Sequence, residues 1–268
     1  MASEHPAPPT SRLRRPRLRG RGMNTLIPNV LTVGALCAGL TAVRFAFLGR
    51  WEHAVAAIII AGILDGLDGR MARLLNATSK FGAELDSLSD FVSFGVAPAL
   101  IIYLWSAQGL GGLGWVAALF YAVCCALRLA RFNTMLGDPN PPPWARHYFT
   151  GVPAPAGAGL ALLPLMLTFE FGTGLFNRPG FCAAVLIGVG VLMVSRVPTF
   201  SVKQLNVSRS FMLPALILAA LIAGALASAP WTTFVIVGTC YLMSIPVSIF
   251  LQRRARQATL PTDPTRAS

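Results

Sequence analysis

The segment Asp65–Asp90, DGLDGRMARLLNATSKFGAELDSLSD, carries four of the six aspartates of the chain within or beside apolar sequence. An ionised side chain in such surroundings is costly and is usually kept for function. Asp65 and Asp68 are three residues apart, and Asp86 and Asp90 are four apart, so each pair shares one helix face. A polar stretch between the pairs predicts a short turn. We therefore expect two antiparallel helices that bring the four carboxylates to one end of a hairpin.

Four carboxylates at one place repel each other and need a positive partner. Their hard oxygen ligands suit Mg²⁺, Mn²⁺ or Ca²⁺, and aspartate-rich sites that hold such ions commonly serve phosphate chemistry. Gly69 and Gly82 lack side chains and let a ligand approach the backbone. Arg73 adds a planar cation suited to phosphate. A polar patch with a purely structural role is the alternative interpretation.

The composition places this hairpin in a membrane. The chain has 268 residues, of which 54% are hydrophobic and 12% are charged, and its mean hydropathy is +0.63. These values are typical of an integral membrane protein. The net charge of +12 fits anionic lipid headgroups and the positive-inside rule, so we expect no nucleic-acid partner.

The hairpin also carries a known residue pattern. The chain resembles the CDP-alcohol phosphotransferases, whose complete signature matches Asp65-x2-Asp68-Gly69-x2-Ala72-Arg73-x8-Gly82-x3-Asp86-x3-Asp90. The resemblance implies a metal site for Mg²⁺ or Mn²⁺ formed by Asp65, Asp68, Asp86 and Asp90. It also implies that the CDP-lipid pocket is lined by Asp65, Asp68, Gly69, Ala72, Arg73, Ser79 and Gly82.

A short motif before the hairpin belongs to the same resemblance. Asn29 and Thr32, in the sequence IPNVLT, resemble the family's Asn-x2-Thr pair near the nucleotide. Capping of a helix at the membrane edge is the simpler alternative for these two residues.

The predicted architecture is an all-α integral membrane protein with the helical core of this family. We expect a disordered basic cytoplasmic arm over residues 1–22, a transmembrane catalytic domain over 23–250 and a cytoplasmic tail over 251–268. About eight spans have the roughly 20 residues that a bilayer core requires, at 29–48, 53–74, 82–105, 113–133, 153–170, 180–198, 209–228 and 231–250. The placement of Lys and Arg predicts that both termini and the aspartate end of the hairpin face the cytoplasm.

Three later stretches narrow the resemblance to the phosphatidylserine synthases of bacteria and archaea. They are RLARFN within residues 126–133, GVPAP within 149–159 and SRVPTFSVK within 194–203. On charge and position, Arg128, Arg131 and Arg196 are candidates for binding the serine carboxylate or a lipid phosphate. For Arg128 and Arg131 the alternative is a pair of interfacial cations that reach the lipid headgroups.

The resemblance implies transfer of the phosphatidyl group from CDP-diacylglycerol to the hydroxyl of L-serine, which gives phosphatidylserine and CMP. It implies a metal-assisted direct displacement, with Asp90 as the base that takes the serine proton. It further implies a homodimer among membrane lipids, in a prokaryotic inner or cytoplasmic membrane.

Two other functions stay open. The same family also uses other acceptors, such as glycerol 3-phosphate or inositol phosphate, although the motifs after the hairpin favour serine. A divalent-cation transporter could use the aspartates as its ion site. The family spacing of Gly69, Ala72, Arg73 and Gly82 speaks against a transporter, because ion permeation needs no phosphate pocket.

Overall fold

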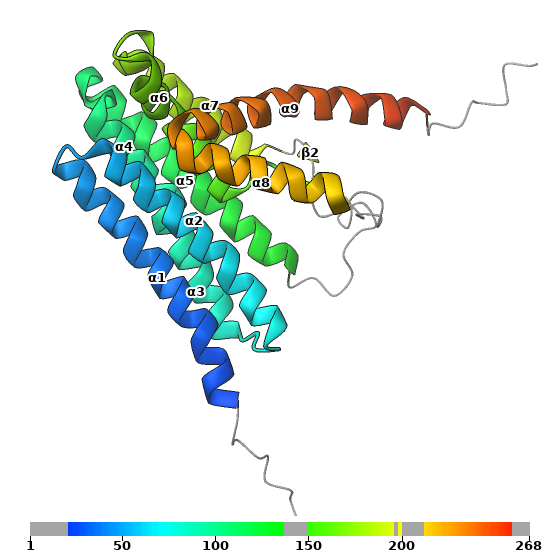
Figure 1. Ribbon diagram of the computed structural model, residues 1–268. Coiled ribbons are helices and arrows are strands. Elements are labelled where there is room, and N and C mark those ends of the chain that lie inside the picture. Colours follow the sequence, from blue (N-terminus) through cyan, green and yellow to red (C-terminus); the bar gives the residue numbers. More distant parts are fainter. Residues whose placement is uncertain (1–20, 137–148, 196–197, 200–211, 259–268) are drawn as a thin grey trace, which may run out of the picture.

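The computed structural model describes residues 21–136, 149–195, 198–199 and 212–258 of the chain, and this described part is almost entirely helical (Figure 1). The first half contains α1 (Arg21–Phe47), α2 (Trp51–Leu74), α3 (Lys80–Asp90), the π-helix η1 (Phe91–Val96), α4 (Ala97–Trp105), the short 3₁₀-helix η2 (Ala107–Leu110) and α5 (Gly112–Leu136). The second half contains β1 (Phe149–Thr150), α6 (Ala154–Phe171), the 3₁₀-helix η4 (Leu175–Asn177), α7 (Pro179–Val194), β2 (Pro198–Thr199), α8 (Met212–Ser228) and α9 (Pro230–Ala258).

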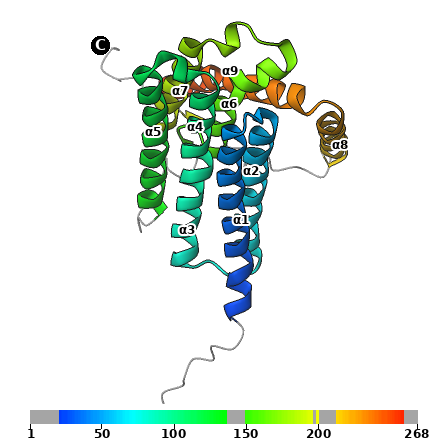
Figure 2. The ribbon, with the colours of Figure 1, turned by 90° about the vertical axis from the view of Figure 1, so that its left-hand side faces the viewer.

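The long helices of the first half form one bundle, in which α1, α2, the stretch from α3 to α4, and α5 run side by side (Figure 2). The bundle has small residues at its helix contacts. Ala42 of α1 and Ala54 and Ala61 of α2 are fully buried, which allows the close helix approach that membrane bundles favour. In contrast, α8 and α9 run across the direction of the bundle (Figure 1).

Within the described residues, four helical stretches have the length and apolar composition that a membrane crossing requires: Leu26–Phe47, Lys80–Trp105, Gly112–Thr134 and Ala154–Phe171. The expected helical integral membrane protein is therefore confirmed, while the count of eight spans stays a prediction. Helix α2 is not among the four, because its second half carries Asp65, Asp68, Arg70 and Arg73.

A π-helix follows the second aspartate pair directly. In η1 the hydroxyl of the buried Tyr121 of α5 donates to the backbone carbonyl of Phe94 at 2.9 Å. A Cβ on Gly95 would lie 3.2 Å from Cβ and Sγ of Cys125, so α5 packs close to this turn. π-Helical turns occur frequently at functional sites, and this one lies immediately after Asp90.

The later motifs also meet in space. The short strands β1 and β2 pair antiparallel, with Phe149 opposite Thr199 and Thr150 opposite Pro198. Gly151 follows with a φ of +88°, and a Cβ there would lie 2.5 Å from the carbonyl oxygen of Met193. The Gly-Val-Pro-Ala-Pro stretch therefore packs against the end of α7 and the strand that follows it.

Candidate active site

The hairpin of α2 and α3 brings the aspartates together as expected. Asp65 and Asp68 lie in the second half of α2, Asp86 lies in α3, and Asp90 is the last residue of α3. One carboxylate oxygen each from Asp65, Asp68 and Asp86 lies within 4.8 Å of the others. The side chain of Asp90 is hydrogen-bonded to that of Asp65 and so joins the group from one side.

The turn of the hairpin follows from its sequence. Asn76 adopts a φ of +49°, a left-handed conformation that Asn tolerates better than most residues. Ser79 then begins α3 as its N-cap, and its hydroxyl oxygen accepts the backbone N–H of Gly82 at 3.0 Å. The hydroxyl of Ser79, predicted to line the CDP-lipid pocket, is thus used for capping in this structure.

Helix α1 supplies the second wall of the site. The hydroxyl of Thr32 donates to Oδ2 of Asp68 at 2.6 Å, and both residues are 4% exposed. A Cβ on Gly82 would lie 3.0 Å from Oδ1 of Asn29 and 3.1 Å from Oγ of Ser79. The structure therefore brings Asn29 and Thr32 to the aspartate end of the hairpin, although they are far from it in sequence.

The remaining residues of the signature lie at the same end. Gly69 sits one helix turn before Arg73, and a Cβ on Gly69 would be 3.8 Å from a guanidinium nitrogen of Arg73. Arg73 is exposed, while Gly69, Ala72 and Gly82 are half-buried. An exposed cation beside a glycine and a carboxylate cluster suits an anionic ligand that enters from the helix end.

The three arginines of the later motifs differ in placement. Arg128 of α5 is half-buried and interacts electrostatically with Asp90, and its Nε is buried with no hydrogen-bond partner among the described residues. The guanidinium of Arg131 donates to the carbonyl of Val194 in α7 at 3.5 Å, a long hydrogen bond. Arg196 lies outside the described residues.

Sequence reasoning missed three residues near the site. The amide nitrogen of Asn133 donates to Oγ of Ser87 at 2.8 Å and ties α5 to α3. Tyr241 of α9 interacts electrostatically with Arg128, and the hydroxyl of Ser89 donates to the backbone carbonyl of Thr32 at 3.1 Å. Asn133 stands in the quoted RLARFN motif, so a signal existed there. Nothing in the apolar sequence around Tyr241 singles it out, and Ser89, although inside the aspartate segment, is not a fixed position of the signature.

The residues present fit a divalent metal ion. Three carboxylates within 4.8 Å of one another provide hard oxygen ligands and a negative charge that a divalent cation neutralises. Asp68 is buried and already fixed by Thr32, as is usual for metal ligands held by an outer shell of hydrogen bonds.

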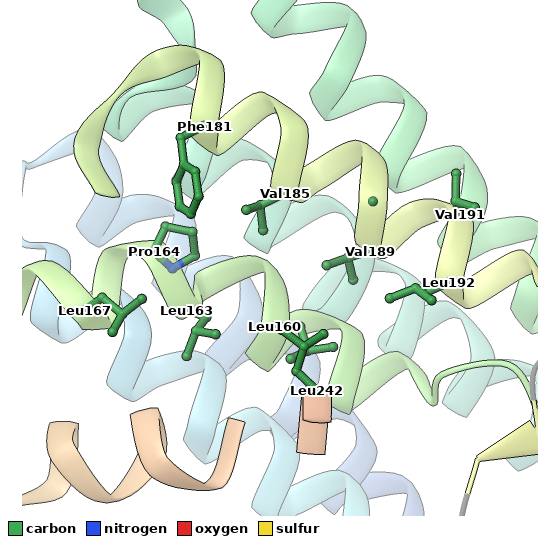
Figure 3. Close-up of a pocket in the computed structure, with 11 residues that line it drawn as sticks. Leu160, Leu163, Pro164, Leu167, Phe181, Val185, Val189, Val191, Leu192 and Leu242 are labelled. Atoms are coloured by element: carbon green, nitrogen blue, oxygen red, sulfur yellow. The ribbon is translucent and has the colours of Figure 1, made fainter. Parts of the chain in front are cut away.

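A cavity of about 510 Å³ lies elsewhere, between α6, α7 and Leu242 of α9 (Figure 3). Its walls come from Leu, Val, Pro, Phe and Gly residues such as Leu160, Pro164 and Val189. Such a lining suits hydrocarbon and offers no ligand for a metal or a phosphate. The aspartate cluster is therefore the candidate for chemistry.

Fold and site together define an integral membrane protein with a cluster of carboxylates, suited to a divalent metal ion, at the end of a helix hairpin. The model of the CDP-alcohol phosphatidyltransferase family matches residues 25–200, and the model described as CDP-alcohol phosphatidyltransferase 2 matches residues 211–246. The chain belongs to the CDP-alcohol phosphatidyltransferase family. The second match covers all of α8 and somewhat more than the first half of α9, where the sequence showed only apolar spans.

Curated relatives carry a common name. The chain is 41% identical over 239 residues to the CDP-diacylglycerol–serine O-phosphatidyltransferase of Mycobacterium leprae. The aligned residues cover 89% of this chain and 79% of the relative. It is 37% identical over 183 residues to the Helicobacter pylori protein of that name, covering 68% of this chain and 75% of the relative. The Bacillus subtilis protein of that name is 36% identical over 171 residues, covering 64% of this chain and 88% of the relative.

Proposed function

We propose that this protein transfers the phosphatidyl group of CDP-diacylglycerol to the hydroxyl of L-serine and releases CMP. The observation that carries the proposal is the convergence of Asp65, Asp68 and Asp86, with Asp90 hydrogen-bonded to Asp65. This site stands in a chain that is 41% identical over 239 residues to a CDP-diacylglycerol–serine O-phosphatidyltransferase. The signature residues and the relatives therefore support the same reaction.

The donor carries a pyrophosphate, which needs positive charge before a nucleophile can approach. A divalent ion, Mg²⁺ or Mn²⁺, held by Asp65, Asp68 and Asp86 would supply that charge. Arg73 lies exposed at the same helix end, and its guanidinium would bind a phosphate oxygen. Gly69, Ala72 and Gly82, together with Asn29 and Thr32 of α1 and Ser79 at the start of α3, would line the remainder of the CDP-lipid pocket.

Asp90 is the proposed general base. It takes the proton of the serine hydroxyl, whose oxygen forms a bond to the β-phosphorus of the donor. The bond from this phosphorus to the oxygen of CMP breaks, and CMP leaves with the electron pair. The side chain of Asp90 shares a hydrogen bond with Asp65 and interacts electrostatically with Arg128, so it links the proposed metal site to α5. It is also the proposed fourth metal ligand.

The acceptor side of the site is proposed on α5. Arg128 is the strongest of the three arginine candidates for the serine carboxylate, because it interacts with Asp90 and keeps its Nε free of hydrogen bonds among the described residues. Arg131 already donates to Val194. Arg196 stays a candidate on sequence grounds.

The distribution of Lys and Arg and the bacterial relatives together support a location for the protein in the cell. We propose a prokaryotic cytoplasmic membrane, with the termini and the aspartates facing the cytoplasm, and a catalytic domain over residues 23–250. The matched family segments, 25–200 and 211–246, fall inside this domain, and the relatives named above are bacterial. The homodimer stays a prediction from family resemblance, to be checked by the mass of the purified protein in detergent.

The deciding experiment measures CMP release from CDP-diacylglycerol by purified protein with Mn²⁺ or Mg²⁺. The acceptors compared are L-serine, glycerol 3-phosphate, myo-inositol phosphate and none. Serine-dependent release with formation of phosphatidylserine supports the proposal. Release with another acceptor would keep the aspartate chemistry and overturn the serine assignment, and no release from folded protein would favour the cation transporter.

Metal removal gives a second prediction. Treatment with EDTA should reduce serine-dependent CMP release to background, because the clustered carboxylates would then repel the pyrophosphate. Added Mn²⁺ or Mg²⁺ should restore it, and the two titrations would rank the metals. Full activity after exhaustive chelation would contradict a metal-assisted reaction.

A further inference from the structure

One residue of α1 links all three helices around the aspartates. The hydroxyl of Thr32 lies 2.6 Å from Oδ2 of Asp68 and 3.0 Å from the carbonyl oxygen of Pro28. A hydroxyl has a single proton to donate, and the carboxylate is the nearer and stronger acceptor. The bond to Thr32 therefore holds one oxygen of Asp68 and sets the plane of its carboxylate relative to Asp65 and Asp86.

Thr32 is also hydrogen-bonded by a residue of α3. The hydroxyl of Ser89, which is 2% exposed, donates to the backbone carbonyl of Thr32 at 3.1 Å. Ser89 stands directly before Asp90 and three residues after Asp86 in sequence. Helix α3, which carries Asp86 and Asp90, thus fixes the position of Thr32, and Thr32 in turn holds the carboxylate of Asp68 in α2.

A second serine makes the same type of bond to another residue of α1. The hydroxyl of Ser93 in η1, which is fully buried, donates to the backbone carbonyl of Ala35 at 3.2 Å. Ser93 and Ser89 are four residues apart, and Ala35 and Thr32 are three apart. Loss of either hydroxyl removes one buried bond between the two helices, but only Ser89 bonds to Thr32.

We propose that Ser89 is a positioning residue of the metal site, which acts through Thr32 on the carboxylate of Asp68. The inference rests on the metal site of the proposed function and extends it to two hydroxyls that need not touch the substrate. Outer hydrogen bonds of this kind orient metal ligands, and their loss typically weakens metal binding or activity by about 10-fold to 100-fold.

The test measures Mn²⁺ binding to purified full-length protein in detergent, without substrate, from the electron paramagnetic resonance signal of free Mn²⁺. Thr32→Val should raise the dissociation constant by about 10-fold to 100-fold, and Thr32→Ser, which keeps the hydroxyl, should stay within about threefold of wild type. Ser89→Ala should raise the dissociation constant for Mn²⁺ by roughly threefold to tenfold. Ser93→Ala, the matched control, should change it by less than about twofold.

A double variant separates positioning from general packing. If Ser89 acts through Thr32, Ser89→Ala should weaken Mn²⁺ binding by less than about twofold in the Thr32→Val background. Thermal unfolding without metal should be similar for Ser89→Ala and Ser93→Ala, since each loses one buried bond. Equal effects of these two variants on Mn²⁺ affinity, or full additivity in the double variant, would overturn the inference.

The outcomes also distinguish the inference from the proposed function. Wild-type protein that binds Mn²⁺ with the predicted variant pattern, but forms no phosphatidylserine, would refute the function and leave the positioning role standing. Phosphatidylserine formation by the wild type, with unchanged Mn²⁺ affinity in Ser89→Ala, would support the function and refute the positioning role. Wild-type protein that binds no Mn²⁺ would overturn the positioning inference, while formation of phosphatidylserine would still decide the function.

Discussion

Asp90 ends α3, where its side chain shares a hydrogen bond with Asp65 and interacts electrostatically with Arg128. If it is the base, Asp90→Asn leaves a group of equal size that cannot accept the serine proton. We expect turnover to fall by at least about 100-fold, measured as serine-dependent CMP release, while binding of CDP-diacylglycerol is largely kept. The control is Glu84→Gln, an exposed carboxylate on the same helix, which should leave turnover unchanged. Turnover near the wild-type rate in Asp90→Asn would rule out its role as base.

Arg128 and Arg131 offer a matched pair on α5. A charged hydrogen bond to the serine carboxylate is worth roughly 1.5–3 kcal/mol, so Arg128→Gln should lower kcat/KM for serine by about 10-fold to 100-fold. Arg131→Gln removes a guanidinium that already donates to Val194 and should have a smaller effect. Initial rates with serine and CDP-diacylglycerol varied separately provide the measurement. A change confined to the KM for CDP-diacylglycerol would reassign Arg128 to the lipid phosphate.

The residues of the site were predictable to the extent that spacing encodes them. Helical periodicity places Asp65 with Asp68 and Asp86 with Asp90, and a polar turn folds the two pairs together. Periodicity within one helix contains no information about its contacts with a distant helix. The bonds from Thr32 to Asp68 and from Ser89 to Thr32, which cross 36 and 57 residues of sequence, therefore required the structure.

At the scale of elements, α1 and η1 approach so closely that only glycine fits at one point. A Cβ on Gly39 would lie 2.5 Å from Oγ and 2.8 Å from Cα of Ser93. The gain in helix propensity from Gly39→Ala is at most about 1 kcal/mol, and the backbone clash outweighs it, since overpacking costs about 1–3 kcal/mol. Thermal unfolding in detergent should show a lower melting temperature for this variant.

The control for this prediction is Gly159→Ala in α6. Among the described residues, no atom outside the helix neighbourhood of Gly159 lies within 4 Å of a Cβ placed there, so the change should be neutral or slightly stabilising. An unchanged melting temperature for Gly39→Ala would mean that α1 and η1 do not pack as closely as described.

Hydropathy predicted the elements better than their arrangement. The expected span over residues 82–105 appears as one helical stretch, Lys80–Trp105, but the π-helix η1 within it has no signature in composition. The expected span over 231–250 lies within α9, which runs across the bundle (Figure 1). The length of an apolar run tells how far a helix can reach, whereas its direction depends on packing against neighbours.

At the scale of the whole molecule, the helices of the first half alternate in direction along the bundle, and charge is distributed unequally between its two ends (Figure 2). The α2–α3 turn lies beside Arg70, Arg73 and Lys80, whereas the opposite end, which includes η2, carries Arg50 and Arg178 among its few cations. From the positive-inside rule we expect the end with the aspartates to face the cytoplasm. A soluble CMP product and serine would then enter and leave on that side.

Two exposed positions make this orientation measurable. Thr78 lies in the α2–α3 turn and Gln108 lies in η2, on opposite ends of the bundle. A membrane-impermeant maleimide should label Thr78→Cys only in inside-out vesicles and Gln108→Cys only in right-side-out vesicles. The wild-type chain with its five native cysteines, all in apolar segments, provides the background. The reverse labelling pattern would place the aspartates outside the cell, where no cytoplasmic nucleotide-linked lipid headgroup or serine could reach them, and would overturn the orientation while leaving the site geometry intact.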